Sequence, residues 1–288
     1  MSKSAILRSS IAKKYWMALT GLFLCTFLIG HLIGNLQLIF IHGEEGKRAF
    51  NEYAYFMQHN MFIKILSYVT YISIIFHAVD GLMLAVQNKK ARAQKYAYNN
   101  PGANSSTASR QMALLGSIIL IFIATHMVNF WAKMHFDHIP LHTKTISFPN
   151  PATGSSESVD LYLTTKGEYV PAQGVEVKDG TYLYANGIDV QMAEGYKDLH
   201  SVVMAFFGQS KDGFETNKMA LVATILYVLS MAVLAFHLWH GFASAFQSLG
   251  LRHKRYTPVI AWTGKLFSIV VPLLFAIIPV LIYIGFVK

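Results

Sequence analysis

The chain has 288 residues, of which 53% are hydrophobic and only 14% are charged. A soluble globular protein has about 25% charged residues, so this composition excludes an ordinary soluble domain and indicates an integral membrane protein. The formal net charge of +9 is concentrated in segments between apolar stretches, where it acts as a topology signal. A nucleic-acid-binding function is therefore not expected.

Five stretches are long and apolar enough to cross a hydrocarbon core, which needs about 20 helical residues. They are residues 15 to 40, 62 to 87, 111 to 134, 218 to 246 and 264 to 287. We expect an all-α integral membrane protein, a bundle of five transmembrane helices with an extracytoplasmic insertion. The predicted divisions are helices one to three in residues 1–134, the insertion in residues 135–217, and helices four and five in residues 218–288.

The first stretch follows a basic N-terminal segment and has the look of a secretory signal. It is too long for the apolar region of such a signal, and no small-residue cleavage site follows it. We therefore interpret it as a retained transmembrane helix. The single cysteine, Cys25, lies inside it, which excludes an internal disulfide and a covalent C-x-x-C-H haem attachment.

The charged residues predict an orientation. Three connecting segments, residues 1 to 14, 88 to 110 and 247 to 262, carry basic residues and no acid. Of the 15 acidic residues, 14 fall in residues 41 to 61 and 133 to 218. The positive-inside rule then places the N-terminus in the cytoplasm and the C-terminus outside.

The insertion between helices three and four is long, polar and acidic. Its stretch GVEVKDGTYLY alternates about Asp179-Gly180, which predicts a β-hairpin. The stretch DLHSVVMAFFG, residues 198 to 208, predicts a short helix at the membrane interface. We expect a small outer cap built of hairpins.

Each of the first four predicted spans contains at least one histidine, and the fifth span has none. A rise of about 1.5 Å per residue places His31 and His126 toward the outer side, and His77 and His237 toward the cytoplasm. Two pairs at two depths are what two haems need, each iron held from both faces by a neutral ring nitrogen. Intramembrane ionisable residues are rare and usually functional. For any single histidine the alternative is a polar contact between helices.

Glycines accompany three of these histidines one helical turn further along. Glycine leaves the helix surface bare, so that a flat porphyrin could lie against the backbone. The glycines are Gly34, Gly81 and Gly241, which follow His31, His77 and His237.

Titratable neighbours accompany two of the histidines. Asp80 lies three residues after His77, and His240 lies three residues after His237, so each shares a helix face with its histidine. They could bond a haem propionate or relay protons. A polar contact that holds two helices together is the equally weighted alternative.

Four stretches of the chain carry a resemblance to a known protein family. The stretches SSIAKKYWMALTGLFLCTFLIGHLIGN, FNEYAYFMQHN, FHAVDGL and FHLWHGFASAFQSLGL resemble the five-helix, di-haem cytochrome b subunit of succinate:quinone oxidoreductases and fumarate reductases. The resemblance covers nearly all of the membrane part. It implies that His31 and His126 hold a distal haem iron and that His77 and His237 hold a proximal one, which is the pairing given by the depth count.

The resemblance also implies the rest of a respiratory complex in the bacterial cytoplasmic membrane. A flavoprotein subunit with covalent FAD and an iron–sulfur subunit would dock on the cytoplasmic face and hold the dicarboxylate site. This chain would be the enzyme's membrane anchor and would carry electrons through two haem b groups to a quinone, usually menaquinone. That reaction links the tricarboxylic acid cycle to the respiratory chain. The long insertion departs from the family, most members of which have a short connection there.

A quinone that exchanges electrons also exchanges protons, so its site needs a titratable group near water. Glu52, in the outer segment between the helices of His31 and His77, is the first candidate, with Tyr53, Tyr55 and His59 close in sequence. Asp80 is the second candidate. For Glu52 the alternative is a solvated loop carboxylate.

The remaining histidines are weaker candidates. His135, His138 and His142 have a spacing typical of metal ligands, but no thiol or helical frame accompanies them, so we interpret them as parts of a solvated loop. We assign no ligand role to those in loops or at helix ends, His42, His59, His200 and His253.

Two other classes of protein stay open. One is the di-haem cytochrome b subunit of another respiratory complex, such as a formate dehydrogenase or hydrogenase anchor. The cytochrome b of a quinol:cytochrome c reductase fits less well, because it has two histidines on each of two helices. The other class is a haem-free channel or transporter, which should show inverted repeats or broken helices with midplane charges. The fifth span contains Pro272 and Pro279 but no charge between Lys265 and Lys288.

Overall fold

The computed structural model of the chain describes residues 9–91, 103, 106–149, 154–209 and 214–287. Parts of the basic segments used to predict the orientation, residues 1–8 and 92–102, lie outside these ranges. The chain divides into two compact units, which are described separately. Unit 1 comprises Met1–Ile33, Lys64–Ala124 and Ile225–Ile277, and unit 2 comprises Gly34–Ile63, Thr125–Thr224 and Ile278–Lys288.

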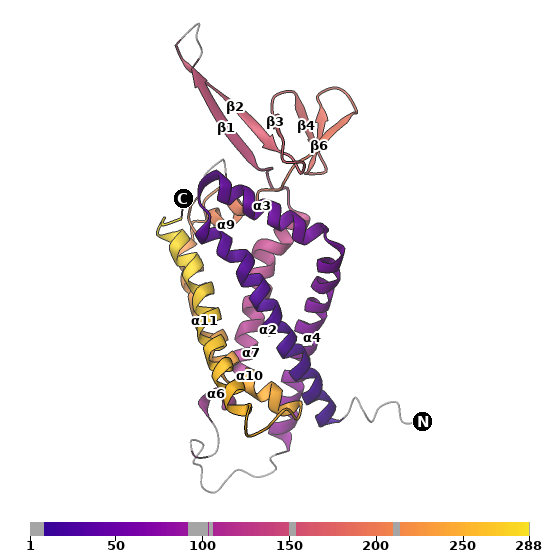
Figure 1. Cartoon of the computed structure of the whole chain (residues 1–288), viewed down its shortest axis with the longest axis vertical. Coiled ribbons are helices and arrows are strands. Elements are labelled where there is room, and N and C mark those ends of the chain that lie inside the picture. Colours follow the sequence, from indigo (N-terminus) through magenta and orange to yellow (C-terminus); the bar gives the residue numbers. More distant parts are fainter. Residues whose placement is uncertain (1–8, 92–102, 104–105, 150–153, 210–213, 288) are drawn as a thin grey trace, which may run out of the picture. The chain divides into compact units, whose positions relative to one another are not determined.

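Within the described residues, five helices are long and apolar enough to cross a membrane. The predicted fold class, an all-α multi-pass membrane protein with a small β insertion, is confirmed (Figure 1). The spans are α2 (Ser10–Phe40), α4 (Met61–Lys90), the helix Met112–Phe136, α10 (Ala220–Ser248) and α11 (Thr257–Tyr283).

The third span is not a regular α-helix throughout. It consists of α7 (Met112–His126), a π-helical stretch η1 (Met127–Ala132) and α8 (Lys133–Phe136), and the short α6 (Thr107–Arg110) precedes it. The π-helix begins directly after His126, one of the predicted ligands. Single π turns inside helices are rare and are frequently found at functional sites.

The fifth span begins seven residues earlier and ends four residues earlier than predicted. Its start at Thr257 places Pro258 in the first turn, where proline is tolerated because its missing N–H has no helical partner. At its end Gly285 has φ +71°. The amides of Gly285 and Phe286 donate to the carbonyls of Ile282 and Leu281 at 2.9 and 3.0 Å, a Schellman motif that stops the helix.

In unit 1 the long helices contact one another through aromatic rings and close approaches at glycine. A Cβ on Gly264 of α11 would lie 2.6 Å from Phe242 of α10, so this crossing requires glycine. Ring pairs link α2 to α11, α7 to α10 and α10 to α11: His31–Phe275 at 5.6 Å, Phe122–Tyr227 at 5.0 Å and Phe242–Phe267 at 5.6 Å.

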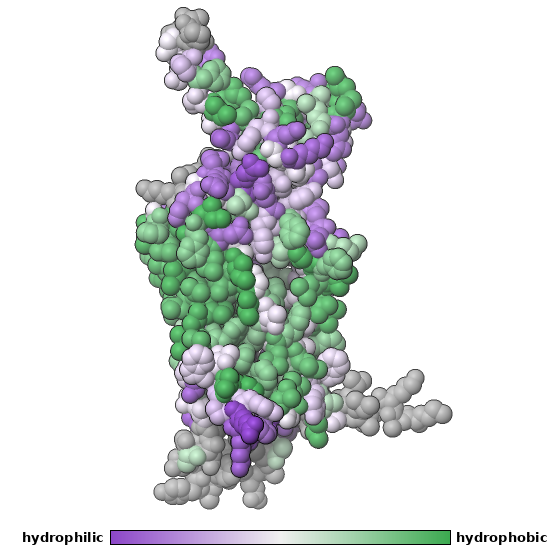
Figure 2. All heavy atoms as spheres, viewed as in Figure 1, coloured by the Kyte–Doolittle hydropathy of each residue, from purple (hydrophilic) through white to green (hydrophobic). Residues whose placement is uncertain are grey.

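The outward side chains of the spans are mostly apolar. Phe62 is 83% exposed, Trp262 66% and Phe236 62%, and Figure 2 shows apolar side chains covering the long helices while polar and apolar ones are mixed over the strands. Contact of such a surface with water costs about 25 cal/mol per Å². These faces therefore contact membrane lipid.

Unit 2 contains a helix that the sequence analysis did not anticipate. Residues 43–59, interpreted as a plain outer segment, form the amphipathic α3 (Gly43–His59). Its buried face repeats at helical spacing and consists of Gly46, Lys47, Phe50, Asn51 and Ala54. Because Lys47 and Asn51 are polar, hydropathy does not indicate this buried face.

The predicted insertion forms two small antiparallel sheets and a short helix. The first sheet has the order β1 (Thr143–Pro149), β2 (Ser156–Leu163), β3 (Tyr169–Pro171), and the second has the order β4 (Val175–Lys178), β5 (Tyr182–Ala185), β6 (Gln191–Glu194). The predicted hairpin is confirmed as β4–β5, in which Asp179 and Gly180 have φ +51° and +75°, as a type I′ turn requires. The predicted short helix is confirmed as α9 (Leu199–Phe206).

Candidate functional site

The structure brings together two of the four predicted ligand histidines. His77 of α4 and His237 of α10 lie in unit 1 with their ring centroids 6.2 Å apart and their planes at 69°. Two imidazoles bound to opposite faces of one metal ion have centroids about 6 Å apart, because each metal–nitrogen bond is about 2.0 Å long. The two rings therefore have the separation that a shared metal ion requires.

Hydrogen bonds to α2 determine the tautomer of His77. Its Nδ1 lies 3.1 Å from the carbonyl oxygen of Met17 and 3.3 Å from Oγ1 of Thr20. Because a carbonyl oxygen only accepts, Nδ1 carries the hydrogen and Nε2 keeps its lone pair. Metal-binding histidines commonly donate their second ring N–H to a backbone carbonyl in this way.

Two glycines of neighbouring helices lie against the histidine rings. A Cβ on Gly21 of α2 would be 3.0 Å from Cε1 of His77, and a Cβ on Gly116 of α7 would be 3.5 Å from Cε1 of His237. The sequence analysis considered only the glycines that follow each histidine and missed these two. The signal was present, since MALTG (residues 17 to 21) and MALLG (residues 112 to 116) are nearly the same motif.

The predicted glycines Gly81 and Gly241 each face a methionine. A Cβ on Gly81 would be 3.9 Å from Sδ of Met17, and a Cβ on Gly241 would be 3.8 Å from Cε of Met112. These are ordinary contacts with flexible side chains. Contact of either glycine with a porphyrin stays a prediction.

Gly34, the third predicted glycine, is tightly covered. A Cβ on it would lie 2.5 Å from Cε1 and 2.8 Å from Oη of Tyr53, whereas a Cβ on Gly30 would meet nothing within 4 Å. We therefore expect Gly34→Ala to displace the Tyr53 ring and to destabilise unit 2 by about 1–3 kcal/mol, as over-packing does. Gly30→Ala on the same helix is the matched control and should be neutral or slightly stabilising. Thermal unfolding of the detergent-solubilised variants measures both, and equal melting temperatures would contradict the tight contact.

The other two predicted ligands belong to different units. His31 lies in unit 1, where it stacks on Phe27 with centroids 5.4 Å apart and contacts Phe275. His126 is the last residue of α7 and lies in unit 2, with its ring 5.3 Å from that of Phe130. Their pairing on one haem stays a prediction.

His240 and Asp80 are both partly buried. Among the described residues neither makes a hydrogen bond or an ion pair, and they do not bond to each other. The structure thus gives no support to the alternative of a polar contact between α4 and α10 at this position. A role toward a haem propionate or a proton stays a prediction.

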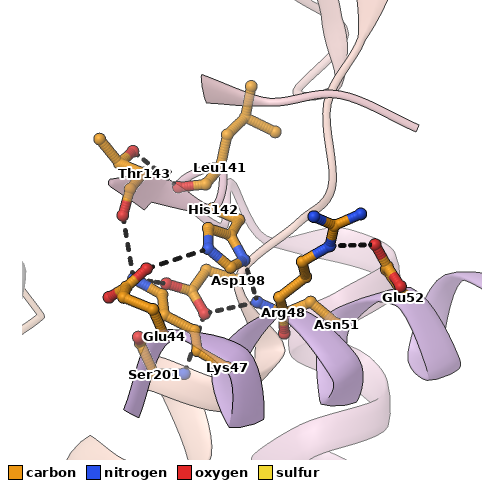
Figure 3. Close-up of polar contacts among 10 residues, drawn as sticks. All are labelled: Glu44, Lys47, Arg48, Asn51, Glu52, Leu141, His142, Thr143, Asp198 and Ser201. Carbon is orange, nitrogen blue, oxygen red and sulfur yellow. Dashed lines mark hydrogen bonds and ion pairs between the residues drawn. The ribbon is translucent and has the colours of Figure 1, made fainter. Parts of the chain in front are cut away.

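Glu52 lies on the half-exposed face of α3 and forms an ion pair. Its Oε1 accepts from Nε of Arg48 at 2.7 Å, and the two side chains are 37% and 40% exposed (Figure 3). This hydrogen bond raises the pKa of Arg48. Glu52 is therefore a helix residue, so the alternative interpretation was wrong about the loop but right that the carboxylate contacts solvent.

Two of the three residues named with Glu52, Tyr55 and His59, contact the second sheet or each other. The Tyr55 hydroxyl donates to Oε2 of Glu194 at 3.1 Å, and the His59 ring stacks on Tyr55 at 3.8 Å. Burial and the Glu194 carboxylate raise the pKa of Tyr55 to about 12. The hydroxyl therefore keeps its proton at neutral pH, and its bond fixes α3 to β6.

A buried polar cluster joins α3 to the insertion within unit 2 (Figure 3). Lys47 Nζ lies 3.0 Å from Asp198 Oδ2, and these side chains are 5% and 1% exposed. Asn51 Nδ2 donates to Asp198 Oδ1 at 2.9 Å and lies 3.1 Å from His142 Nδ1. The sequence analysis missed these residues because their ion pair joins positions 151 apart.

His142 corrects the solvated-loop interpretation of the H-x-x-H-x-x-x-H stretch. Its side chain is completely buried, while His135 and His138 are exposed. Within the part of the chain that the structure describes, no three His, Cys, Asp or Glu side chains converge as a metal site would require.

The arrangement in unit 1 supplies two imidazoles on neighbouring helices, one of which has its tautomer fixed from a third helix. Such a donor set could hold a metal ion or a metal-containing cofactor within a membrane. Comparison of the chain with protein-family models, with curated protein sequences and with solved structures finds no match.

Proposed function

We propose that this chain is the di-haem cytochrome b subunit of a bacterial succinate:quinone oxidoreductase or fumarate reductase. It anchors the complex in the cytoplasmic membrane and carries electrons between the iron–sulfur subunit and a quinone, of which menaquinone is the expected type. The observation that supports this most is the His77–His237 pair, with rings 6.2 Å apart in a membrane-spanning unit.

The residues around this pair fit a haem. Nδ1 of His237 is buried and has no hydrogen-bond partner among the described residues, so no hydrogen bond at that nitrogen restricts how the ring is oriented. The glycines Gly21 and Gly116 leave room for both rings to lie close to the neighbouring backbones. His77 and His237 would hold the proximal haem, and His31 and His126 the distal one. When bound, haem supplies a site that gains and loses one electron.

The chain's own part in the reaction is to orient the histidine ligands and to keep water away from them. The Met17 carbonyl and Thr20 fix the proton of His77 on Nδ1, which leaves Nε2 as the ligand nitrogen. The apolar helix surfaces keep water away from the iron ligands, so that charge interactions there are strong. Asp80 and His240 are the titratable groups nearest to this pair in sequence, and we propose that they bond a propionate or carry protons.

The basic residues suggest where the soluble subunits dock. Lys89 and Lys90 lie in the last turn of α4, and Arg252, Lys254 and Arg255 precede α11. We propose that these residues face the cytoplasm, as the positive-inside rule predicts. Charge of one sign on a docking face favours rapid and correctly oriented association.

Purification of the intact complex through a tag on this chain tests the proposal. We expect a flavoprotein with covalent FAD and an iron–sulfur protein to copurify, and the preparation to transfer electrons between succinate and a quinone. Copurification of a molybdenum- or nickel-containing catalytic subunit would instead assign the chain to a formate dehydrogenase or a hydrogenase.

For the quinone site we propose Glu52 as the proton-exchanging group, with Asp80 as the second candidate. Glu52→Gln keeps the shape of the side chain and removes its charge. We expect intact haem spectra and normal succinate oxidation with an artificial dye, but quinone-linked turnover reduced at least tenfold, which is about 1.4 kcal/mol of barrier.

The ion pair of Glu52 provides the control for this variant. Arg48→Gln removes the partner and leaves the carboxylate, so that quinone turnover should fall much less than in Glu52→Gln. Wild-type quinone turnover in Glu52→Gln would refute the assignment and point to Asp80 or His240. An equal loss of quinone turnover in both variants would show that this turnover depends on the ion pair and not on the carboxylate alone.

A further inference from the structure

The contacts around the histidine pair in unit 1 occur twice. On α2 and α4, Gly21 contacts the His77 ring and Met17 contacts Gly81. On α7 and α10 the same contacts are made by Gly116 with His237 and by Met112 with Gly241. The sequences agree, because MALTG faces FHAVDG in one copy and MALLG faces FHLWHG in the other.

The two copies of the MAL-x-G motif differ at one position, which is Thr20 in one copy and Leu115 in the other. The Thr20 hydroxyl donates its hydrogen to the Trp16 carbonyl at 2.8 Å. Its oxygen can therefore accept the Nδ1 hydrogen of His77, 3.3 Å away. Leu115 has no polar atom to offer, and Nδ1 of His237 is buried without a partner among the described residues.

We propose that Thr20 is a positioning residue that makes the two ligands of the proximal haem unequal. Its hydroxyl, together with the Met17 carbonyl, orients the His77 ring and draws on its N–H, which raises the basicity of the ligand nitrogen. His237, whose neighbouring motif has Leu115 at the position of Thr20, is the weaker ligand. This inference rests on the proposed function, since it concerns how strongly each histidine binds the iron.

Redox titration of the haems in the intact complex measures the effect. A more basic ligand favours the ferric state, so Thr20→Val should favour the ferrous state of one haem. We expect the ferrous-to-ferric ratio at a fixed potential to rise about three- to tenfold, which is an upward shift of about 30 to 59 mV for a one-electron couple. Leu115→Thr offers His237 the missing acceptor and should shift the same haem downward.

Two variants control for the removal of a hydroxyl from this helix. Thr26→Val removes an exposed hydroxyl that bonds only to the Leu22 carbonyl and should leave both potentials unchanged. Thr20→Ser keeps the hydroxyl and should restore the wild-type potential. If Thr20→Val fails to assemble, Thr20→Ser and Leu115→Thr still give the comparison.

The outcomes separate this inference from the proposed function. A wild-type complex with no b-haem waves would overturn both. Normal wild-type waves with no shift in Thr20→Val and Leu115→Thr, or an equal shift of both haems, would overturn the role of Thr20 alone. Opposite shifts of a single haem in these two variants would establish it.

Discussion

Replacing His77 or His237 with alanine should abolish one b-type haem signal, and the same signal in both cases. Their rings lie 6.2 Å apart, and under the proposed function both would hold the same haem iron. Loss of either imidazole leaves an open iron position in an apolar site, and the low-spin spectrum of a bis-histidine haem should vanish. Low-temperature reduced-minus-oxidised spectra of isolated membranes resolve the two signals.

The other histidines provide the comparison. His31→Ala and His126→Ala should each remove the second haem signal and leave the first. His240→Ala should retain both haems, because His240 is assigned no axial position. If His240→Ala removed a haem while His237→Ala did not, the choice of ligand on α10 would be wrong. If His31→Ala and His126→Ala affected different haems, the depth pairing would be wrong.

The second large effect concerns the buried ion pair of unit 2. Lys47→Met should lower the stability of the junction between α3 and α9 by about 3–5 kcal/mol, because it leaves the Asp198 carboxylate buried without its cation. Hydrogen exchange reports this directly, since the amide of Ser201 donates to Asp198 Oδ1 and that of His200 donates to Asn51 Oδ1. Both amides should exchange faster in the variant.

An exposed ion pair on the same insertion is the matched control. Lys178 lies 3.0 Å from Asp189, whose side chain is 87% exposed, so water screens this pair. Lys178→Met should leave the exchange of the Ser201 and His200 amides unchanged. Equal exchange in Lys47→Met and wild type would show that the buried pair contributes nothing to the junction.

The same junction should depend on pH. Burial raises the pKa of Asp198, but the Lys47 ammonium and the hydrogen bonds from Asn51 and Ser201 outweigh it, so that the pKa is lowered from the ordinary 3.8. A lowered carboxyl pKa gives stability that is fully present above 3.8 and is lost as the pH falls through the folded value. The amides of His200 and Ser201 should therefore lose protection from hydrogen exchange only as the pH falls below 3.8. In Lys47→Met the ammonium that lowers the pKa of Asp198 is absent. The loss of amide protection should therefore begin at a higher pH.

Much of the fold could be predicted because its signals are local. Hydropathy located the five spans, and the Asp179-Gly180 pair located a hairpin whose turn needs two positive φ values. The pairing of His77 with His237 needed only helix rise and direction. The fifth span shifted because its limits are set by Pro258 and Gly285, which hydropathy does not weigh.

The parts that sequence reasoning missed depend on contacts between distant segments. His142 is buried where it contacts Asn51, 91 residues away, and the H-x-x-H-x-x-x-H stretch alone does not predict this contact. The helix α3 was missed because Lys47 and Asn51 occupy its buried face. The contacts of Gly21 and Thr20 with His77 could not be read from the local sequence, because His77 lies 57 residues after Thr20.

The haem content of the purified wild-type complex tests the central claim most directly. Pyridine haemochrome absorbance, divided by the amount of this chain from quantitative amino-acid analysis, gives the number of haem groups per chain. The account predicts two haem b per chain, both removable by acid extraction because the lone Cys25 cannot form a C-x-x-C-H attachment. A ratio of zero, or of one with His31 and His126 dispensable, would contradict it.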